Sequence, residues 1–98
     1  MWVRTFASKV LREFAETRRR VISDWRILVV AHRLAHADNA PLPNEKKAIE
    51  IRNELMKRGD IIPANGVSGV YIVNVAYANL LEVSEEQIVQ EADRKSVV

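Results

Sequence analysis

The sequence predicts a mainly α-helical domain that contains one small β-hairpin. Two observations carry this prediction. Apolar residues recur at i, i+3, i+4 and i+7 in separate stretches, the pattern of helices with one buried face. A later region, 60–75, is instead rich in β-branched residues, and Asn65-Gly66 within it is a strong signal for a hairpin turn.

The length and composition limit the classes of protein to consider. A chain of 98 residues forms one domain at most, and without cysteine it has neither a disulfide framework nor a cysteine-based metal site. No apolar run approaches the roughly 18 residues that span a membrane, and the N-terminus lacks the apolar core of a signal peptide. We therefore expect a soluble, cytoplasmic protein.

A first helix is predicted from Trp2 to about Ile22. Its apolar stripe comprises Val3, Phe6, Ala7, Val10, Leu11 and Phe14. Arg18, Arg19 and Arg20 lie near its expected end, where cations stabilise the helix dipole. The same three arginines can also contact phosphates, so they remain candidates for either role.

A second helix is predicted from Trp25 to about Ala37, with Ser23 or Asp24 as its N-cap. The expected stripe comprises Trp25, Leu28, Val29, His32 and either Ala35 or His36. Residues 27–31 are apolar nearly all round, which predicts the most buried helix of the domain. The polar and proline residues of segment 38–43 end it.

A third helix is predicted from Asn44, its N-cap, to Arg58, and Gly59 can take the left-handed conformation that ends a helix. The predicted buried stripe comprises Ala48, Ile49, Ile51, Leu55 and Met56. A polar row runs down the opposite side and comprises Lys46, Glu50, Asn53 and Lys57. This row is the surface on which we expect a binding function.

Two short strands follow, at 60–63 and 69–75. Pro63 has no amide proton, so its strand is expected at the edge of the sheet or to be very short. After a connector at 76–83, a capping box at 84–87 starts a last helix with Ile88, Val89 and Ala92 on one side. So short a helix must dock on this chain or another. We therefore divide the chain into a domain at 1–76 and a connector with a helix start at 77–98, a truncation or docking segment.

Residues with catalytic or metal-binding potential are few. His32 and His36 have the i, i+4 spacing of a shared metal site, but Arg33 stands where the zinc-protease motif needs glutamate. We expect these histidines beside the core, and we expect no metal, cofactor or catalytic residue. Acidic residues near the C-terminus are expected to be solubilising charge: Glu82, Glu85, Glu86, Glu91 and Asp93. An enzyme is the least supported class.

The charge is divided between the two parts of the chain. Residues 1–58 hold 13 Lys and Arg against 7 Asp and Glu, whereas residues 59–98 hold 2 against 6. A basic part predicts an anionic partner on one face, and an ordinary solvated helix surface is the alternative.

Three helices followed by a hairpin is the order of a winged helix-turn-helix with a two-stranded wing. In that fold the third helix enters the major groove of double-stranded DNA, so the row of Lys46, Glu50, Asn53 and Lys57 would face the bases. Asparagine can bond bidentately to adenine, lysine can bond guanine, and glutamate can accept from cytosine. The expected phosphate contacts are Lys47, Arg58, Arg18, Arg19 and Arg20. Glu50 and Glu54 oppose this reading, as does the absence of a cation at the turn of 65–68.

Residues 48–92 resemble the start of AbiEi-type antitoxins of type IV toxin–antitoxin systems and related bacterial transcriptional regulators. The resemblance lies in Leu55-Met56-Lys57-Arg58-Gly59-Asp60-Ile61, in Gly69-Val70-Tyr71-Ile72-Val73, and in the connector and helix that follow. It implies a winged-helix domain that binds its own promoter, beside a C-terminal domain that counters a nucleotidyltransferase-like toxin. The family usually carries arginines before the Gly-Val-Tyr strand, whereas 64–68 here are uncharged.

We therefore expect a sequence-specific DNA-binding regulator, with a homodimer, a missing C-terminal domain or a partner protein as further partners and no membrane. The alternative is an interaction module that docks or dimerises through Trp2, Phe6, Val10 and Phe14 without binding DNA. DNA binding requires the arginine tract and the cations of the third helix on one connected face. Interaction requires an exposed apolar stripe instead.

Overall fold

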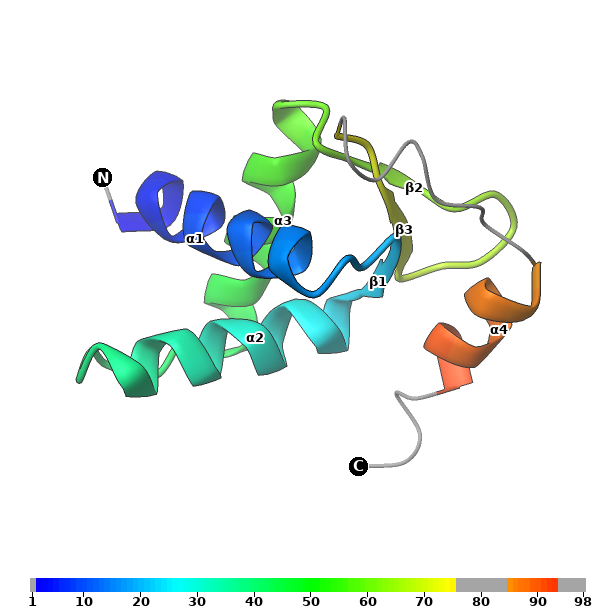
Figure 1. The fold of residues 1–98 in the computed structure, drawn as a ribbon. Coiled ribbons are helices and arrows are strands. Elements are labelled where there is room, and N and C mark those ends of the chain that lie inside the picture. The colour runs from blue at the N-terminus through cyan, green and yellow to red at the C-terminus, as the bar shows by residue number, and fades with distance from the viewer. Residues whose placement is uncertain (1, 76–84, 94–98) are drawn as a thin grey trace.

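The computed structural model describes residues 2–75 and 85–93 (Figure 1). In order, these residues form α1 (Trp2–Glu16), β1 (Val21–Ser23), α2 (Asp24–Ala37), α3 (Glu45–Lys57), β2 (Ile61–Pro63), β3 (Val70–Val73) and α4 (Glu85–Asp93). The domain is mainly helical and carries a small antiparallel sheet. Among the described residues, no helix has both the length and the apolar character that crossing a membrane requires.

The sheet has three strands rather than the two that the sequence predicted. The order is β1-β3-β2, so β3 lies in the centre and pairs antiparallel with both neighbours. The predicted hairpin is β2 and β3, with Ile62 opposite Ile72. Pro63 lies in the edge strand β2, where its missing amide proton removes no ladder hydrogen bond.

The third strand is β1, which the sequence analysis wrongly assigned to the first helix. That helix ends at Glu16, and Arg18 takes a left-handed conformation with φ of 55°. The apolar stripe of α1 stops at Phe14 because the next two positions on that face are Thr17 and Arg18. Val21 and Ile22 then pair with β3 and are buried, which only the presence of β3 makes favourable.

The core lies between α1, α2, α3 and the sheet. The predicted stripe of α1 is confirmed, since Phe6, Ala7, Val10 and Phe14 are all buried. The buried face of α2 was predicted wrongly, because the buried residues lie on a different side of the helix from the predicted stripe. Its buried residues are Arg26, Ile27, Val30, Ala31 and Ala35, whereas Val29 is 38% exposed.

Helix α3 begins and ends as predicted. The side chain of Asn44 accepts a hydrogen bond from the amide of Lys47 at 2.9 Å, and Gly59 is left-handed with φ of 79°. Ala48, Ile51 and Leu55 are buried. Ile49 and Met56 were predicted to be buried but are 41% and 37% exposed, because they lie at the edge of the buried stripe.

Helix α4 docks on the sheet (Figure 1). Ile88 and Ala92 pack against the small cluster of Val21, Ala64 and Val70. The predicted connector at 76–83 and the residue that would cap this helix, Ser84, lie outside the described residues.

Glu91 of α4 was predicted to be solubilising surface charge, and this was wrong. It is 4% exposed, and its Oε1 accepts hydrogen bonds from Arg26 Nε at 2.6 Å and from Ser23 Oγ at 3.1 Å. Arg26 Nη2 bonds the second carboxylate oxygen at 3.3 Å. This buried ion pair holds α4 to the start of α2.

Replacing Glu91 with alanine is expected to lower the free energy of unfolding by about 3 kcal/mol, because Arg26 is left buried without its carboxylate. The matched control is Glu85→Ala on the exposed side of the same helix, which should change stability by less than about 0.5 kcal/mol. Urea denaturation measures both. Equal losses in the two variants would show that the ion pair does not hold α4.

Candidate nucleic-acid interface

Helix α3 presents one surface away from the core. It packs against α1 and α2 and lies behind both in Figure 1. Because Ala48, Ile51 and Leu55 face inward, the opposite side of the helix faces solvent. We call this side the outer face of α3, and it comprises Lys46, Ile49, Glu50, Asn53, Met56 and Lys57. The whole row of polar residues predicted from the sequence lies on it.

The acidic residues beside this face are paired with cations. The Glu50 carboxylate lies 3.2 Å from Lys47 Nζ, and the Lys47 ammonium lies 5.4 Å from the centre of the Trp2 ring. Glu54 forms an ion pair with Arg58 at 2.8 Å. By contrast, neither Lys46 nor Lys57 forms an ion pair within residues 2–75 and 85–93. Among the described residues, the outer face therefore offers two ammonium groups that form no ion pair.

Arg58 was predicted as a phosphate contact, but its guanidinium is used inside the protein. It donates to Glu54 Oε2 at 2.8 Å, to Ser8 Oγ at 3.0 Å and to the Arg4 carbonyl at 2.8 Å. The last two partners belong to α1, so Arg58 ties α1 to the end of α3. The hydrogen bond from Arg58 also holds the pKa of Glu54 below its ordinary value.

A residue that the sequence analysis missed, Arg52, lies at the edge of the outer face. Its Nη1 donates to both carboxylate oxygens of Asp24, at 3.3 and 3.4 Å, and its Nε and Nη2 reach Asn53 Oδ1 at 3.3 and 3.1 Å. The Tyr71 side chain lies beside this pair, and burial together with Asp24 raises the pKa of Tyr71. The available signal was the position of Arg52 beside the buried stripe, where a long cationic side chain can reach a neighbouring helix.

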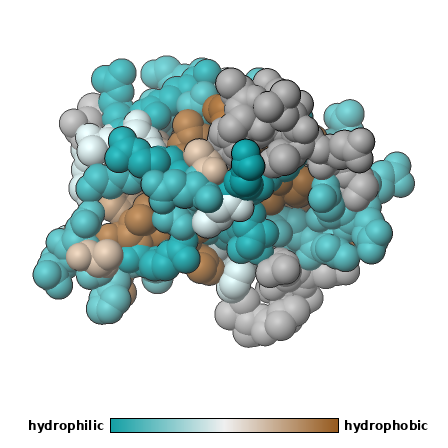
Figure 2. All heavy atoms as spheres, in the orientation of Figure 1, coloured by the Kyte–Doolittle hydropathy of each residue, from teal (hydrophilic) through white to brown (hydrophobic). Residues whose placement is uncertain are grey.

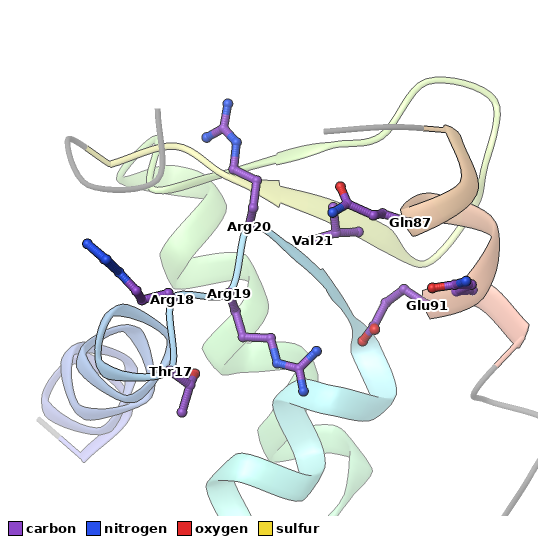
Figure 3. Close-up of a pocket in the computed structure, with 8 residues that line it drawn as sticks. Thr17, Arg18, Arg19, Arg20, Val21, Gln87 and Glu91 are labelled. Carbon is purple, nitrogen blue, oxygen red and sulfur yellow. The ribbon is translucent and has the colours of Figure 1, made fainter. Parts of the chain in front are cut away.

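The arginine tract lies elsewhere. Arg18, Arg19 and Arg20 line a pocket of about 440 Å³ between the end of α1 and α4, and Glu91 lines it too. Figure 3 shows the three side chains pointing in different directions, with α3 behind them. Arg20 donates to the carbonyl of Val73. The structure therefore does not bring the tract together with the outer face of α3, and the three guanidinium groups do not converge on one point.

The hairpin turn is bound to the base of α2. The Asp24 amide donates to the Gly69 carbonyl at 3.0 Å, and Gly69 has φ of 80°. Glycine suits this left-handed conformation, because a side chain would be strained there even though a Cβ would meet the Asp24 carboxylate only at 3.4 Å. The turn residues 64–68 carry no charge, and Val67 packs against Val21, Ala64 and Val70.

The apolar stripe of α1, which the interaction alternative requires on the surface, is buried in this chain's own core. Of the four residues named for that alternative, Phe6, Val10 and Phe14 are buried. Trp2 is 38% exposed, and its ring stacks on Phe6 with centroids 4.8 Å apart. Figure 2 shows a largely hydrophilic surface on the side of α1 and α2, with separate small hydrophobic patches. The stripe stabilises the fold and is not a free docking surface.

The two histidines do not meet at a metal site. The ring of His32 is hydrogen-bonded to the carbonyl of Pro43, and His36 is exposed. In the described part of the chain, no three histidine or carboxylate side chains are grouped to hold a metal ion.

Comparisons with protein-family models, with curated proteins and with solved structures find no match to this chain.

The free energy of unfolding distinguishes the structural role of Arg58 from the surface position of its neighbour Lys57. Arg58→Ala is expected to lower the free energy of unfolding by about 1–2 kcal/mol, because it removes hydrogen bonds that join α1 to α3. Lys57→Ala should stay within about 0.5 kcal/mol of the wild type. Thermal and urea denaturation provide the measurement, and a stable Arg58→Ala variant would contradict the structural role.

A second prediction concerns pH. Burial raises the pKa of Tyr71 above its ordinary value of 10.0, and the hydrogen bond to the Asp24 carboxylate raises it further. Above pH 10 the unfolded chain loses the phenol proton while the folded chain keeps it, so stability is full below pH 10 and falls as pH rises. Urea denaturation at about pH 9 and about pH 11 should show a larger loss for the wild type than for Tyr71→Phe. Equal losses of stability in the two proteins would show that the titration of Tyr71 does not contribute to the pH dependence of folding.

Proposed function

We propose that this chain is a winged-helix domain that binds double-stranded DNA through the outer face of α3. The order of elements, α1-β1-α2-α3-β2-β3, supports the proposal, because a helix pair is followed by a hairpin that packs beside it. The antiparallel sheet adds support, because β3 pairs the hairpin with β1, the strand between α1 and α2. In this arrangement α3 is the recognition helix.

The single observation that carries the proposal is the charge of the outer face. Lys46 and Lys57 project from opposite ends of α3, eleven positions and so about 16 Å apart along the axis. Asn53 is exposed between them. Because the major groove is about 12 Å wide, two lysines at this spacing suit phosphates that flank the groove, while a polar amide faces the bases.

Two glutamates, Glu50 and Glu54, argued against DNA binding in the sequence because they repel phosphates. Ion pairs in the folded domain reduce this repulsion. The Glu50 carboxylate on the outer face is paired with Lys47, and Glu54 is paired with Arg58, which bonds α1. Arg58 and the arginine tract contribute little to our proposed contact, since Arg58 bonds α1 and the tract lines a pocket with α4. We propose that Lys46, Lys57 and Asn53 make the main contacts.

The resemblance of residues 48–92 to AbiEi-type antitoxins favours a bacterial transcriptional regulator over other DNA-binding roles. We propose that the domain acts in the cytoplasm on a promoter. Helix-turn-helix proteins commonly bind two half-sites as dimers, so a second copy of this chain is a natural partner on DNA.

The test is fluorescence anisotropy of the 98-residue chain with mixed-sequence duplex DNA at about 50 mM and about 200 mM salt. We expect wild-type affinity to fall steeply with salt, because binding releases counterions from the phosphates. The Lys46→Ala/Lys57→Ala variant should bind about tenfold more weakly, and its salt slope should be smaller by about two.

The matched control is Lys9→Ala/Arg12→Ala, which removes the same charge from the side of α1 that faces α2. It should keep the affinity and the slope of the wild type within a factor of about two. Equal losses in the two double variants would mean that net charge, and not the outer face of α3, governs binding. Absence of binding at low salt would overturn the proposed function.

A further inference from the structure

Every nitrogen of the Arg52 guanidinium has a partner. Nη1 is held by the Asp24 carboxylate at 3.3 and 3.4 Å, whereas Nε and Nη2 both point to Asn53 Oδ1, at 3.3 and 3.1 Å. Arg52 is half-buried, and Asn53 is exposed on the outer face of α3. The arginine thus connects the base of α2 with one amide on the candidate DNA-binding surface.

The anchor of this connection is inside the domain. The Asp24 amide bonds the Gly69 carbonyl at 3.0 Å, and the Asp24 side chain lies beside the buried Tyr71 of β3. Asp24 is therefore held by the sheet and the hairpin before it holds Arg52. An amide that is oriented through such a chain loses less conformational entropy when it binds than a freely rotating side chain does.

The contact with Arg52 determines what Asn53 can offer to a ligand. An amide oxygen only accepts hydrogen bonds, and here it receives two, both from N–H groups of one guanidinium. The remaining group, Nδ2, is a donor with two hydrogens. Asn53 therefore presents hydrogen-bond donors only.

This arrangement changes the base that asparagine would be expected to read. The usual bidentate contact with adenine needs the amide oxygen to accept from N6 while the nitrogen donates to N7. Guanine instead shows two acceptors, O6 and N7, in the major groove. We propose that Asn53 reads guanine, with Arg52 as the positioning residue that keeps its oxygen occupied. This inference rests on the proposed function, and it replaces the adenine contact expected from the sequence.

The experiment first selects preferred sites from a randomised duplex pool with the wild-type chain. It then measures anisotropy on the selected duplex and on two altered duplexes. One carries adenine in place of the selected guanine, and the other carries 7-deazaguanine, which pairs normally but lacks the N7 acceptor. Adenine should weaken binding by roughly 5- to 150-fold, the usual range for one wrong base under a bidentate contact. We expect 7-deazaguanine to weaken it by a smaller factor.

Two variants test the roles of the residues. Asn53→Asp keeps the shape and an oxygen for Arg52 but replaces the donors with a second acceptor, so preference should move from guanine to cytosine, whose N4 donates. Asn39→Asp adds the same charge at an exposed loop position and should keep the guanine preference. Arg52→Met removes the guanidinium and frees Oδ1, so the guanine-over-adenine ratio should fall toward one.

The outcomes separate this inference from the proposed function. Salt-dependent binding without a guanine preference, or an Asn53→Asp variant that selects the same bases as Asn39→Asp, would overturn the guanine assignment and leave DNA binding intact. Absence of binding to any duplex would overturn both. If Arg52→Met does not fold, as circular dichroism would show, the Asn53→Asp comparison still decides the assignment.

Discussion

The junction between β1 and α2 is the constraint on which the rest of this domain depends. Ser23 caps α2 by accepting from the Arg26 amide at 3.1 Å, and its hydroxyl also donates to Glu91 of α4. The next residue, Asp24, bonds the hairpin through its amide and Arg52 of α3 through its carboxylate. Two adjacent residues therefore join the sheet, α2, α3 and α4. A change there alters the position of α3 and, with it, any surface that α3 presents.

The cations of this chain differ in whether they form ion pairs within the folded domain. Those that do so stabilise the fold, and the others can bind a ligand. Within the described residues, the cations of the basic part that form ion pairs include Lys9, Arg26, Arg33, Lys47, Arg52 and Arg58. The ion pair of Arg26 with Glu91 joins the basic part, residues 1–58, to the acidic part, residues 59–98. Because the pair is buried, removing either partner leaves an uncompensated buried charge and destabilises the fold. The net charge of each half is thus a poor guide to the charges that are available at the surface. Our proposal rests on Lys46 and Lys57 because they project from α3 without such a partner among the described residues.

The elements predicted correctly from sequence are those whose signals are local. The cap at Asn44, the left-handed Gly59 and the turn at 65–66 each act within a few residues, so α3 and the hairpin could be placed closely. The misplaced elements depend on distant partners. Strand β1 needs β3, about 50 residues later, before its burial is favourable. Helix α2 is apolar nearly all round, so periodicity alone could not say which side faces the core.

The sequence by itself determined that this chain is a small, mainly helical domain with a hairpin, and that a polar row with two lysines runs down α3. These properties follow from periodicity, caps and turn residues, which depend on neighbours along the chain. Only the tertiary structure decided which cations form ion pairs, that the arginine tract lines a pocket with α4, and that Arg52 holds Asn53 through its oxygen. The physical reason is that ion pairs and hydrogen bonds between distant residues depend on distance and direction in space, which spacing along the chain does not specify.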